Sequence, residues 1–323
     1  MKKGICLLLL CACAVGSLMA EKTHKEIRKS SEYRNARLNG AKTQVLLHVR
    51  DDQDAPVADA DVLVRMGMTF AEKSYDIKGV TDANGDFAIE GITTGNEIGI
   101  SLVKTGYYDS HCQLCYADMR APHEVKDGKW QPYPLEKTVT LRKIRNPVEL
   151  NFYRWSYKSF PATNVVLKLD LEVMDWCPPY GKGQHDDMHL ISTGWNNPTV
   201  RSEFRSNLKV EFPNALDGYY LTRADANSRF RYSYGADPAH EYFKTYDFLF
   251  SRVPTKVVKW QKPCDDEYFV YRVRTQTNEL GKVIHANYGR IAEKLGHLNG
   301  LSMTNWFNPN DMDVNLEDVS EKR

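Results

Sequence analysis

Gly79-Val-Thr-Asp-Ala-Asn-Gly-Asp-Phe-Ala-Ile-Glu-Gly91 is the stretch around which the N-terminal half of this chain is organised. Within it, Asn84-Gly85 separates two runs in which apolar and polar residues alternate. An Asn-Gly pair readily adopts the positive φ angles of a two-residue turn, and alternation with a period of two is typical of strands. The stretch therefore predicts a β-hairpin.

Further strand-like runs lie on both sides of this stretch. Residues 44–49 and 61–64 precede it and are separated by an aspartate-rich loop at residues 51–59, while residues 97–104 and 137–142 follow it. Short alternating runs separated by turn-forming residues are typical of an antiparallel β-sandwich. We therefore expect one small sandwich here, closed by the last of these runs.

A recognisable order of features carries a family resemblance. The features are Pro56 in the aspartate-rich loop, Ala60-Asp-Val62, Thr81-Asp-Ala-Asn-Gly-Asp-Phe87, the run from Ile98 to Val103, and Gly106-Tyr-Tyr108. In this order they resemble the carboxypeptidase regulatory-like domain, a transthyretin-like β-sandwich of the broad immunoglobulin-like kind. The resemblance implies a non-catalytic module, so it transfers no catalytic residues. An insertion at residues 109–136 departs from the family's pattern.

The N-terminus has the features of a secretory signal peptide. Lys2-Lys3 is followed by an apolar run at residues 5–10 and by small residues up to Ala20. The apolar run is too short for a membrane anchor, and we expect cleavage after Ala20. Leu10-Cys-Ala-Cys13 also resembles a bacterial lipobox, which would place a lipidated Cys13 at the mature N-terminus. Both interpretations predict an exported protein in the periplasm, at the cell surface or outside the cell.

Length and composition predict a globular chain with two domains. The chain has 323 residues, of which 42% are hydrophobic, so it can bury ordinary cores. After the signal peptide at residues 1–20 we expect a charged, flexible or partly helical spacer at 21–41, the regulatory-like sandwich at 42–147 and a β-rich domain at 148–323. The 43 Lys and Arg residues of the chain nearly balance its 42 Asp and Glu residues, so the net charge gives no support to a nucleic-acid partner.

The second region predicts another β-sandwich or a jelly-roll-like domain, with an open barrel as the alternative, so the whole chain is expected to be all-β. In residues 268–275, alternation puts Arg272 and Arg274 on one face of a strand and apolar side chains on the other. Strands are expected at residues 148–157, 163–173, 207–212, 229–234, 256–260, 267–275 and 282–291, and a short helix at 292–298.

Several stretches of this region resemble uncharacterised exported bacterial proteins that join a regulatory-like module to a β-rich region. They are Leu169-Asp-Leu-Glu-Val-Met-Asp-Trp176, Pro179-Tyr-Gly-Lys-Gly183, Tyr271-Arg-Val-Arg-Thr275, Asn287-Tyr-Gly-Arg-Ile291, and Asn308-Pro309 with Asn315-Leu-Glu317. The resemblance brings no known activity, and it therefore implies architecture only.

Four cysteines lie beyond the targeting segment, and they allow three disulfide pairings in an oxidising compartment. We expect Cys112 to pair with Cys115, which would close a small loop in the insertion. We expect Cys177 to pair with Cys264, because both lie in proline-containing segments next to a tryptophan. A redox or zinc site is the alternative for the first two cysteines.

Asp175-Trp-Cys-Pro-Pro-Tyr-Gly-Lys-Gly-Gln-His-Asp-Asp-Met-His189 is the stretch richest in metal-ligand residue types. In an extended segment His185, Asp187 and His189 would point the same way and supply three ligands. A solvated loop is the alternative, because short His and Asp clusters often match metal patterns. No other cofactor is indicated.

Two more acidic stretches have weaker patterns of the same kind. Asp82-Ala-Asn-Gly-Asp86 begins like a calcium loop but lacks the glutamate at position 12, so a turn is favoured. Asp311-Met-Asp-Val-Asn-Leu-Glu317 presents four oxygen-bearing side chains on one face if it is extended, and a charged edge strand is favoured there.

Aromatic residues give the remaining signal for function. Trp195 and Trp306 lie in the second region and would stack on sugar rings if exposed, with core packing as the alternative. Signatures such as Gly-x-Ser-x-Gly and His-Glu-x-x-His do not occur. We therefore expect a non-enzymatic binding or structural protein of the bacterial envelope that contacts a carbohydrate, protein or surface ligand. The alternative is a metal-dependent hydrolase with its site at residues 175–189.

Overall fold

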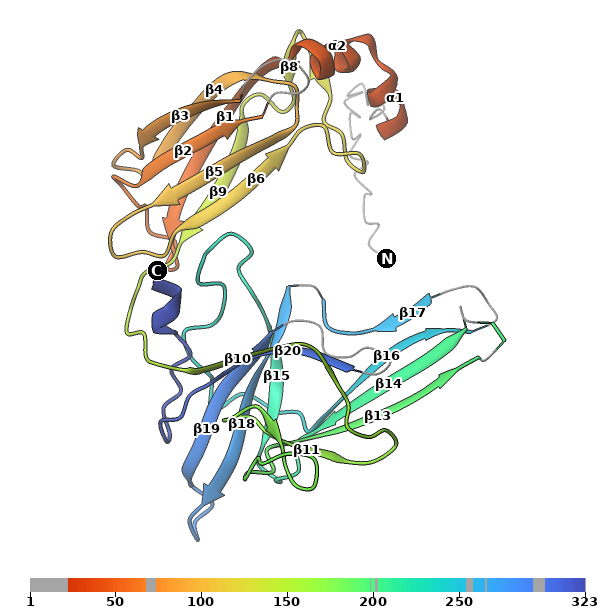
Figure 1. Ribbon diagram of the computed structural model, residues 1–323. Coiled ribbons are helices and arrows are strands. Elements are labelled where there is room, and N and C mark those ends of the chain that lie inside the picture. Colours follow the sequence, from red (N-terminus) through yellow and green to blue (C-terminus); the bar gives the residue numbers. More distant parts are fainter. Residues whose placement is uncertain are drawn as a thin grey trace, which may run out of the picture.

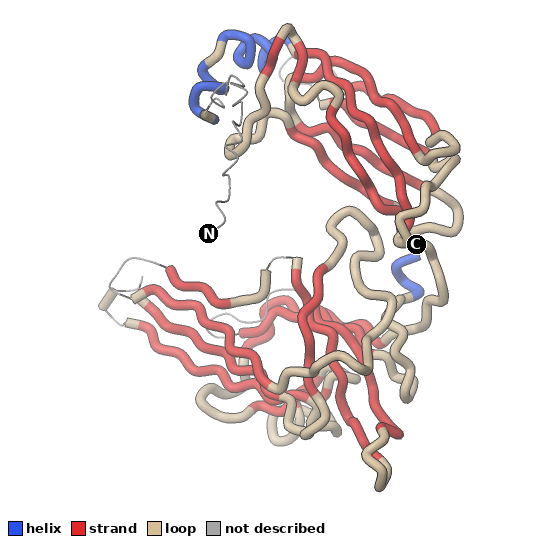
Figure 2. The backbone as a smooth tube through the Cα atoms, turned by 180° about the vertical axis from the view of Figure 1, so that it is seen from behind, coloured by secondary structure: helices blue, strands red, loops and turns tan. Residues whose placement is uncertain are grey.

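The computed structural model describes residues 23–67, 74–197, 199–200, 203–253, 258–264, 266–292 and 300–322. Strands dominate this part of the chain and form four sheets, so the predicted all-β class is confirmed (Figures 1 and 2). The expected signal peptide and Cys13 lie outside the described residues. No helix within the described ranges is both long enough and apolar enough to cross a membrane.

The first two sheets enclose a common apolar core, as expected of a β-sandwich. Their strands are β1 (Ala41–Asp51), β2 (Asp61–Met66), β3 (Tyr75–Val80), β4 (Asp86–Thr93), β5 (Glu97–Val103), β6 (Ser110–Cys115), β7 (Val125–Lys126), β8 (Lys129–Trp130) and β9 (Leu135–Leu141). One sheet has the order β4-β1-β8-β7, with β9 also paired to β1, and the other has the order β3-β2-β5-β6. In β1 every second side chain is buried, because alternate side chains of a strand point to opposite faces.

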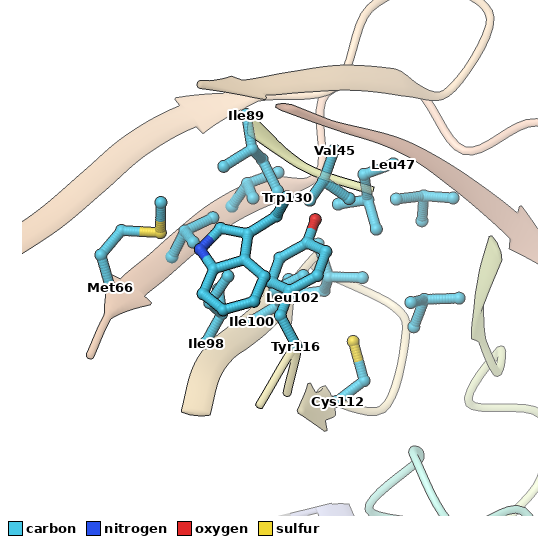
Figure 3. Close-up of a cluster of buried hydrophobic side chains, with 14 of the residues drawn as sticks. Val45, Leu47, Met66, Ile89, Ile98, Ile100, Leu102, Cys112, Tyr116 and Trp130 are labelled. Carbon is cyan, nitrogen blue, oxygen red and sulfur yellow. The ribbon is translucent and has the colours of Figure 1, made fainter. Parts of the chain in front are cut away.

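Residues 109–136 contribute to this core instead of forming a loose insertion. Tyr116 and Trp130 from this segment stack with their ring centroids 5.5 Å apart, beneath Val45 and Leu47 (Figure 3). Trp130 Nε1 donates a hydrogen bond to the Thr93 carbonyl at 2.9 Å. The indole is therefore buried with its polar atom satisfied, which fixes the segment to the sandwich.

The turn at Asn84-Gly85 does not form the predicted hairpin. Strand β3 pairs with β2 and strand β4 pairs with β1, so the turn carries the chain from one sheet to the other. Asp82 closes the turn through a hydrogen bond from the Gly85 amide to its carbonyl, at 2.9 Å. Gly85 has a φ of +73°, and a Cβ there would lie 2.4 Å from the Val49 carbonyl oxygen. A glycine is required because the turn packs against the end of β1.

Two short helices cover one end of the first core. They are α1 (His24–Lys29) and α2 (Ser31–Asn39). Thr23 and Glu26 form a capping box at the start of α1, and Ser30 caps α2. Tyr33 is buried and packs edge-on against Trp130, with ring centroids 5.8 Å apart. This part of the expected spacer is thus packed against the sandwich.

The second pair of sheets also encloses an apolar core. Its strands are β10 (Asn151–Ser159), β11 (Leu167–Asp170), β12 (Asp175–Trp176), β13 (Met188–Asn196), β14 (Phe204–Glu211), β15 (Gly218–Arg223), β16 (Thr245–Arg252), β17 (Val258–Gln261), β18 (Glu267–Thr277), β19 (Val283–Ala292) and β20 (Gly300–Phe307). The five-stranded sheet has the order β10-β20-β19-β18-β15, and the six-stranded sheet has the order β12-β11-β13-β14-β16-β17. A 3-10 helix, η1 (Val319–Lys322), follows the last strand.

Several local predictions for this region differ from the structure. The hairpin between β18 and β19 is confirmed, but residues 229–234 form no strand. The predicted alternation in β18 ends at a bulge after Val273, and Arg274 has a φ of +58°. Arg272 therefore donates to the Leu216 carbonyl, while Arg274 reaches a separate group of carboxylates. Apart from its first residue, Ala292, the expected helix at 292–298 lies outside the described residues.

The loop after β15 and the C-terminal segment join the second pair of sheets to the first (Figure 1). The His111 amide donates to the Asn227 carbonyl at 2.7 Å, and the Arg229 amide donates to the Asp109 carbonyl at 2.8 Å. The ring of Tyr108 packs on that of Phe230 with 5.0 Å between centroids. The two halves are therefore held together by main-chain hydrogen bonds and by buried aromatic side chains.

Candidate functional site

A cavity of about 500 Å³ lies at the end of the five-stranded sheet where β18 begins and β15 ends. A volume of this size is typical of small-molecule sites. Strands β10, β16, β18, β19 and β20 contribute to its wall, together with the segments that follow β15 and β17. The site is thus assembled from parts of the chain that are far apart in sequence.

Four aromatic side chains form the apolar part of the wall. They are Tyr232, Phe248, Tyr268 and Phe269. The last three are almost fully buried, so core packing fixes their positions. Tyr232 is partly exposed, and the guanidinium carbon of the fully buried Arg290 lies 4.1 Å from its ring centroid. Core packing therefore fixes these rings, and among the four only Tyr232, which lies beside a cation, is accessible to a ligand.

Three basic side chains also line the cavity: Arg154 from β10, Arg231 from the loop after β15, and Lys262 after β17. Arg154 and Arg231 are exposed, and Lys262 is partly buried. They come from three separate segments around one volume. The cavity therefore has basic side chains on more than one side.

Two carboxylates share the wall, and both have a basic neighbour outside it. Arg223 Nε lies 3.7 Å from Asp266 Oδ2 and 4.0 Å from Glu267 Oε1. Glu267 Oε2 also accepts a hydrogen bond from the Cys264 amide at 2.7 Å. Both carboxylates are therefore partly neutralised by Arg223, and Glu267 also by the Cys264 amide.

Arg142, which directly follows β9 of the first sandwich, holds one wall of this cavity. Its Nη1 atom donates to the carbonyls of Phe230, at 2.9 Å, and Tyr232. The guanidinium also lies 4.5 Å from the ring centroids of Phe230 and Tyr234. Because the two carbonyls flank Arg231, these contacts fix the backbone from which the Arg231 side chain enters the cavity.

The structure separates the two tryptophans that the sequence proposed for ligand binding. Trp195 is 50% exposed and lies on the outer face of β13, away from the cavity. Trp306 is only 8% exposed, and its ring packs against Phe152 and Tyr232. As a correction, Trp306 belongs to the core and presents no face for a ligand, whereas a role for Trp195 stays a prediction.

The three predicted metal ligands do not converge. His185 is exposed, Asp187 is buried against Arg274, and His189 Nε2 lies 2.8 Å from Asp186. Among the described residues, no three His, Cys, Asp or Glu side chains are placed to hold a metal ion. The stretch at 175–189 is instead a loop held in place by hydrogen bonds, and metal binding there stays a prediction without geometric support.

Arg274 donates the hydrogen bonds that hold this loop in place. Its Nε and Nη2 atoms each donate to Asp187 at 2.9 Å, and Nη2 also donates to Asp170 at 3.1 Å. Asp170 in turn accepts hydrogen bonds from the amides of Gln184 and His185. Burial raises the pKa of Asp187, and the hydrogen bonds from Arg274 oppose this rise without cancelling it. The cluster therefore has a structural role.

The predicted disulfides are absent, since all four described cysteines have free thiols. Cys112 and Cys115 both lie on β6, where residues three apart point to opposite faces and lie about 10 Å apart, too far for a disulfide. Cys177 is buried and its thiol donates to the His185 carbonyl at 3.2 Å. Cys264 is exposed and lines the cavity. It therefore offers a chemical handle at the candidate site.

The other two acidic stretches have structural roles. Asp82 Oδ1 accepts hydrogen bonds from the amides of Asn84 and Asp86, which completes the turn between the sheets. In the C-terminal stretch Asp311 lies 2.6 Å from His285 Nδ1, and Glu317 is buried and accepts hydrogen bonds from three groups. Their oxygens are thus used within the fold.

Sequence reasoning missed most of the cavity. Of its polar and aromatic residues, only Cys264 was singled out, and for a different role. Lys262-Pro-Cys264 and Arg231-Tyr232 each place a basic residue within two positions of another lining residue. That signal is too common in sequences to indicate a site, because only the folded sheets bring these segments together.

Comparisons with known proteins leave the family open. No protein-family model and no curated protein matches the chain. The 3-chlorocatechol 1,2-dioxygenase of Rhodococcus opacus 1CP is similar over 33% of this chain, at 17% identity and a TM-score of 0.26. The chlorocatechol 1,2-dioxygenase of Pseudomonas putida is similar over the same share, at 14% identity and a TM-score of 0.25. Each alignment spans 61% of the dioxygenase chain.

A third similar structure is a protein of unknown function from Bacteroides fragilis NCTC 9343 that is described as membrane-associated. The alignment covers 83% of this chain and 98% of the other, at 10% identity and a TM-score of 0.21. Likenesses of this strength carry no argument about activity. The resemblance to carboxypeptidase regulatory-like domains stays a prediction, since no family model supports it.

Proposed function

We propose that this chain is an exported, non-enzymatic binding protein of the bacterial envelope, and that it binds a carbohydrate in the cavity at the start of β18. The observation that carries the proposal is the composition of the cavity wall, which places the partly exposed ring of Tyr232 beside charged side chains around about 500 Å³. Flat aromatic faces stack on the apolar faces of sugar rings, and charged groups bind hydroxyl groups.

The first sandwich acts as an adaptor in this proposal. Its resemblance to regulatory-like domains implies a module without catalysis, and its Arg142 contacts the carbonyls on either side of Arg231. The signal-peptide features of residues 1–20 support export of the chain. Delivery to the envelope would place the cavity where extracellular or cell-wall saccharides occur.

A glycan array probed with the purified exported chain tests the proposal. We expect binding to a restricted set of saccharides, and we expect Cys264→Trp to abolish it, because the larger side chain would fill the mouth of the cavity. Cys264→Ser is the matched control and should bind as the natural chain does. A chain that binds no saccharide would contradict the proposal.

Trp195→Ala separates this site from the one that the sequence suggested. Trp195 is exposed but lies outside the cavity, so its removal should leave the array pattern unchanged. If Trp195→Ala loses saccharide binding while Cys264→Trp keeps it in full, the saccharide binds on the outer face of β13 and not in the cavity.

A further inference from the structure

We infer that the end of the first sandwich that is covered by α1 and α2 lies against the surface of an anionic lipid bilayer. This surface takes no part in the proposed binding of carbohydrate, so the inference stands apart from that proposal. It is carried by the charge of the two helices, by exposed apolar side chains beside them, and by the place where the N-terminal segment joins the fold.

The two helices carry more basic than acidic side chains. Residues 23–40 contain five Lys and Arg residues and two Glu residues, which are Lys25, Arg28, Lys29, Arg34 and Arg37 against Glu26 and Glu32. The neighbouring segment 116–130 contains three basic and three acidic residues, so it leaves this excess unchanged. The helical end of the sandwich is therefore basic, although the whole chain is nearly neutral.

Two of these side chains point directly away from the core. Ile27 is the buried residue of α1, and Lys25 and Lys29 lie two positions before and after it. Successive residues of a helix are rotated by about 100°, so both lysines lie about 200° around the helix from Ile27, on the opposite side. Both are exposed. Their ammonium groups are thus presented outward at the helical end.

Exposed apolar side chains lie at the same end. Leu38 on α2 is 74% exposed, and Met119 in the loop after β6 is 80% exposed. Arg28 Nη1 donates to the Met119 carbonyl at 2.8 Å, which holds this loop beside α1. Basic groups with apolar side chains beside them suit a bilayer surface, because the cations meet anionic headgroups while the apolar groups enter the boundary with the acyl chains.

The opposite end of the sandwich presents carboxylates. Strand β1 runs from Ala41, beside the helices, to Asp51, and eleven residues at about 3.3 Å each separate the two ends by about 33 Å. The exposed aspartates of the far end are Asp54, Asp59, Asp61 and Asp82. Figure 1 shows the helices and the junction with the second pair of sheets at opposite ends of the sandwich. An anionic surface repels these aspartates, which favours contact through the helices.

The N-terminal segment joins the fold at the helical end. Thr23 is the N-cap of α1, and Cys13 of the lipobox-like sequence lies ten positions before it. Ten residues span at most about 35 Å when fully extended. A lipid on Cys13 would therefore keep the helical end within this distance of the bilayer, so that the anchor and the basic helices act at the same face.

Vesicle co-sedimentation tests the inference. The exported chain without a lipid is mixed with vesicles of phosphatidylcholine alone, or of equal parts of phosphatidylcholine and phosphatidylglycerol. We expect its partition coefficient on the anionic vesicles to be about tenfold or more above that on the neutral ones, and the difference to shrink as salt is added. No binding to the anionic vesicles, or equal partition on both, would overturn the inference.

The double variant Lys25→Gln, Lys29→Gln tests the assigned surface. We expect its partition coefficient on the anionic vesicles to fall about tenfold, because each lysine contributes to attraction by an anionic surface. The matched control is Lys78→Gln, Lys282→Gln, which removes the same charge from exposed positions on β3 and in the turn between β18 and β19. Equal losses in both double variants would indicate general electrostatic attraction and would overturn the assignment.

The glycan array separates this inference from the proposed function. The double variant Lys25→Gln, Lys29→Gln should bind saccharides as the natural chain does, since the helices lie outside the cavity. A chain that binds saccharides but no anionic vesicles would keep the proposed function and refute the inference. A chain that binds anionic vesicles through the helices but no saccharide would do the reverse.

Discussion

Tyr108 Oη donates a hydrogen bond to Glu317 Oε1 at 2.9 Å, although the two residues are 209 positions apart in the chain. Both side chains are buried, and the same carboxylate accepts hydrogen bonds from the amides of Arg145 and Asn146. A single carboxylate thus joins the first sandwich, the connector and the C-terminal segment. Its hydrogen bonds hold the two halves of the molecule in a fixed relation.

Tyr108→Phe is expected to destabilise the chain. It removes a buried hydrogen bond to a charged group, which should lower the free energy of unfolding by about 1–3 kcal/mol. Denaturant unfolding followed by tryptophan fluorescence measures the change. Tyr107→Phe is the matched control, because the neighbouring Tyr107 is partly exposed and contacts Lys143 through its ring. Equal stability of the two variants would contradict the role of Glu317.

Arg142→Ala should weaken ligand binding although Arg142 does not line the cavity. Without its guanidinium, the carbonyls of Phe230 and Tyr232 lose their donor and the base of Arg231 loosens. We expect a several-fold lower affinity for a bound saccharide in calorimetry. Arg142→Lys keeps the charge and should recover part of that affinity. An unchanged affinity in a destabilised Arg142→Ala variant would show that the residue serves stability alone.

Asp51 should make stability depend on acid pH. Burial raises the pKa of Asp51, but hydrogen bonds from Lys143 and from the amides of Ala55 and Gln53 lower it by more, so the net pKa lies below its ordinary value of 3.8. A carboxyl with a lower pKa in the folded than in the unfolded chain adds stability above the unfolded value. That stability is lost as the pH falls through the folded value.

Asp51→Asn checks this pH dependence. Its Tm should lie below that of the natural chain at pH about 6, and the difference should narrow as the pH falls below about 4. Differential scanning calorimetry across this range gives both values. A Tm difference that stays constant down to pH about 2 would show that the charge of Asp51 is unimportant.

The loop at residues 175–189 should depend on Asp187 for stability and not on its histidines. Asp187→Asn removes one of the charged partners of Arg274, which we expect to lower the free energy of unfolding by about 1–3 kcal/mol. The double variant His185→Ala, His189→Ala should remain close to the natural chain in stability. Metal analysis by mass spectrometry should detect no stoichiometric ion; an ion lost in the double variant would support the hydrolase alternative.

Local patterns in the sequence predicted most strands of the first sandwich, but they missed β6, β7 and β8, which lie in the segment interpreted as an insertion. They did not predict how the strands pair. The turn at Asn84-Gly85 was predicted correctly, yet β3 pairs with β2 and β4 pairs with β1, instead of with each other. The choice of partner depends on contacts between residues far apart in sequence. The disulfide between Cys112 and Cys115, in contrast, could have been excluded by treating their segment as a strand, because residues three apart on a strand point to opposite faces.

The candidate site was beyond local prediction. Arg274 left the predicted face of β18 because a bulge breaks the alternation, and a bulge has no reliable sequence signature. Trp195 and Trp306 looked equivalent, yet one is exposed and the other buried. Arg154, Arg231 and Lys262 carry no motif and come to line one cavity only when the two sheets of the second half assemble.

Protection of the Cys264 thiol shows directly whether a saccharide occupies the cavity. Cys264 lines the cavity and is exposed, and Cys115 is an exposed thiol on β6, outside it. Maleimide labelling of both can be followed by mass spectrometry with and without a saturating concentration of a saccharide that binds on the array. We predict that the saccharide slows labelling of Cys264 and leaves that of Cys115 unchanged. If a saccharide binds while both thiols react at their original rates, its binding site lies outside the cavity and the proposed function of the cavity is wrong.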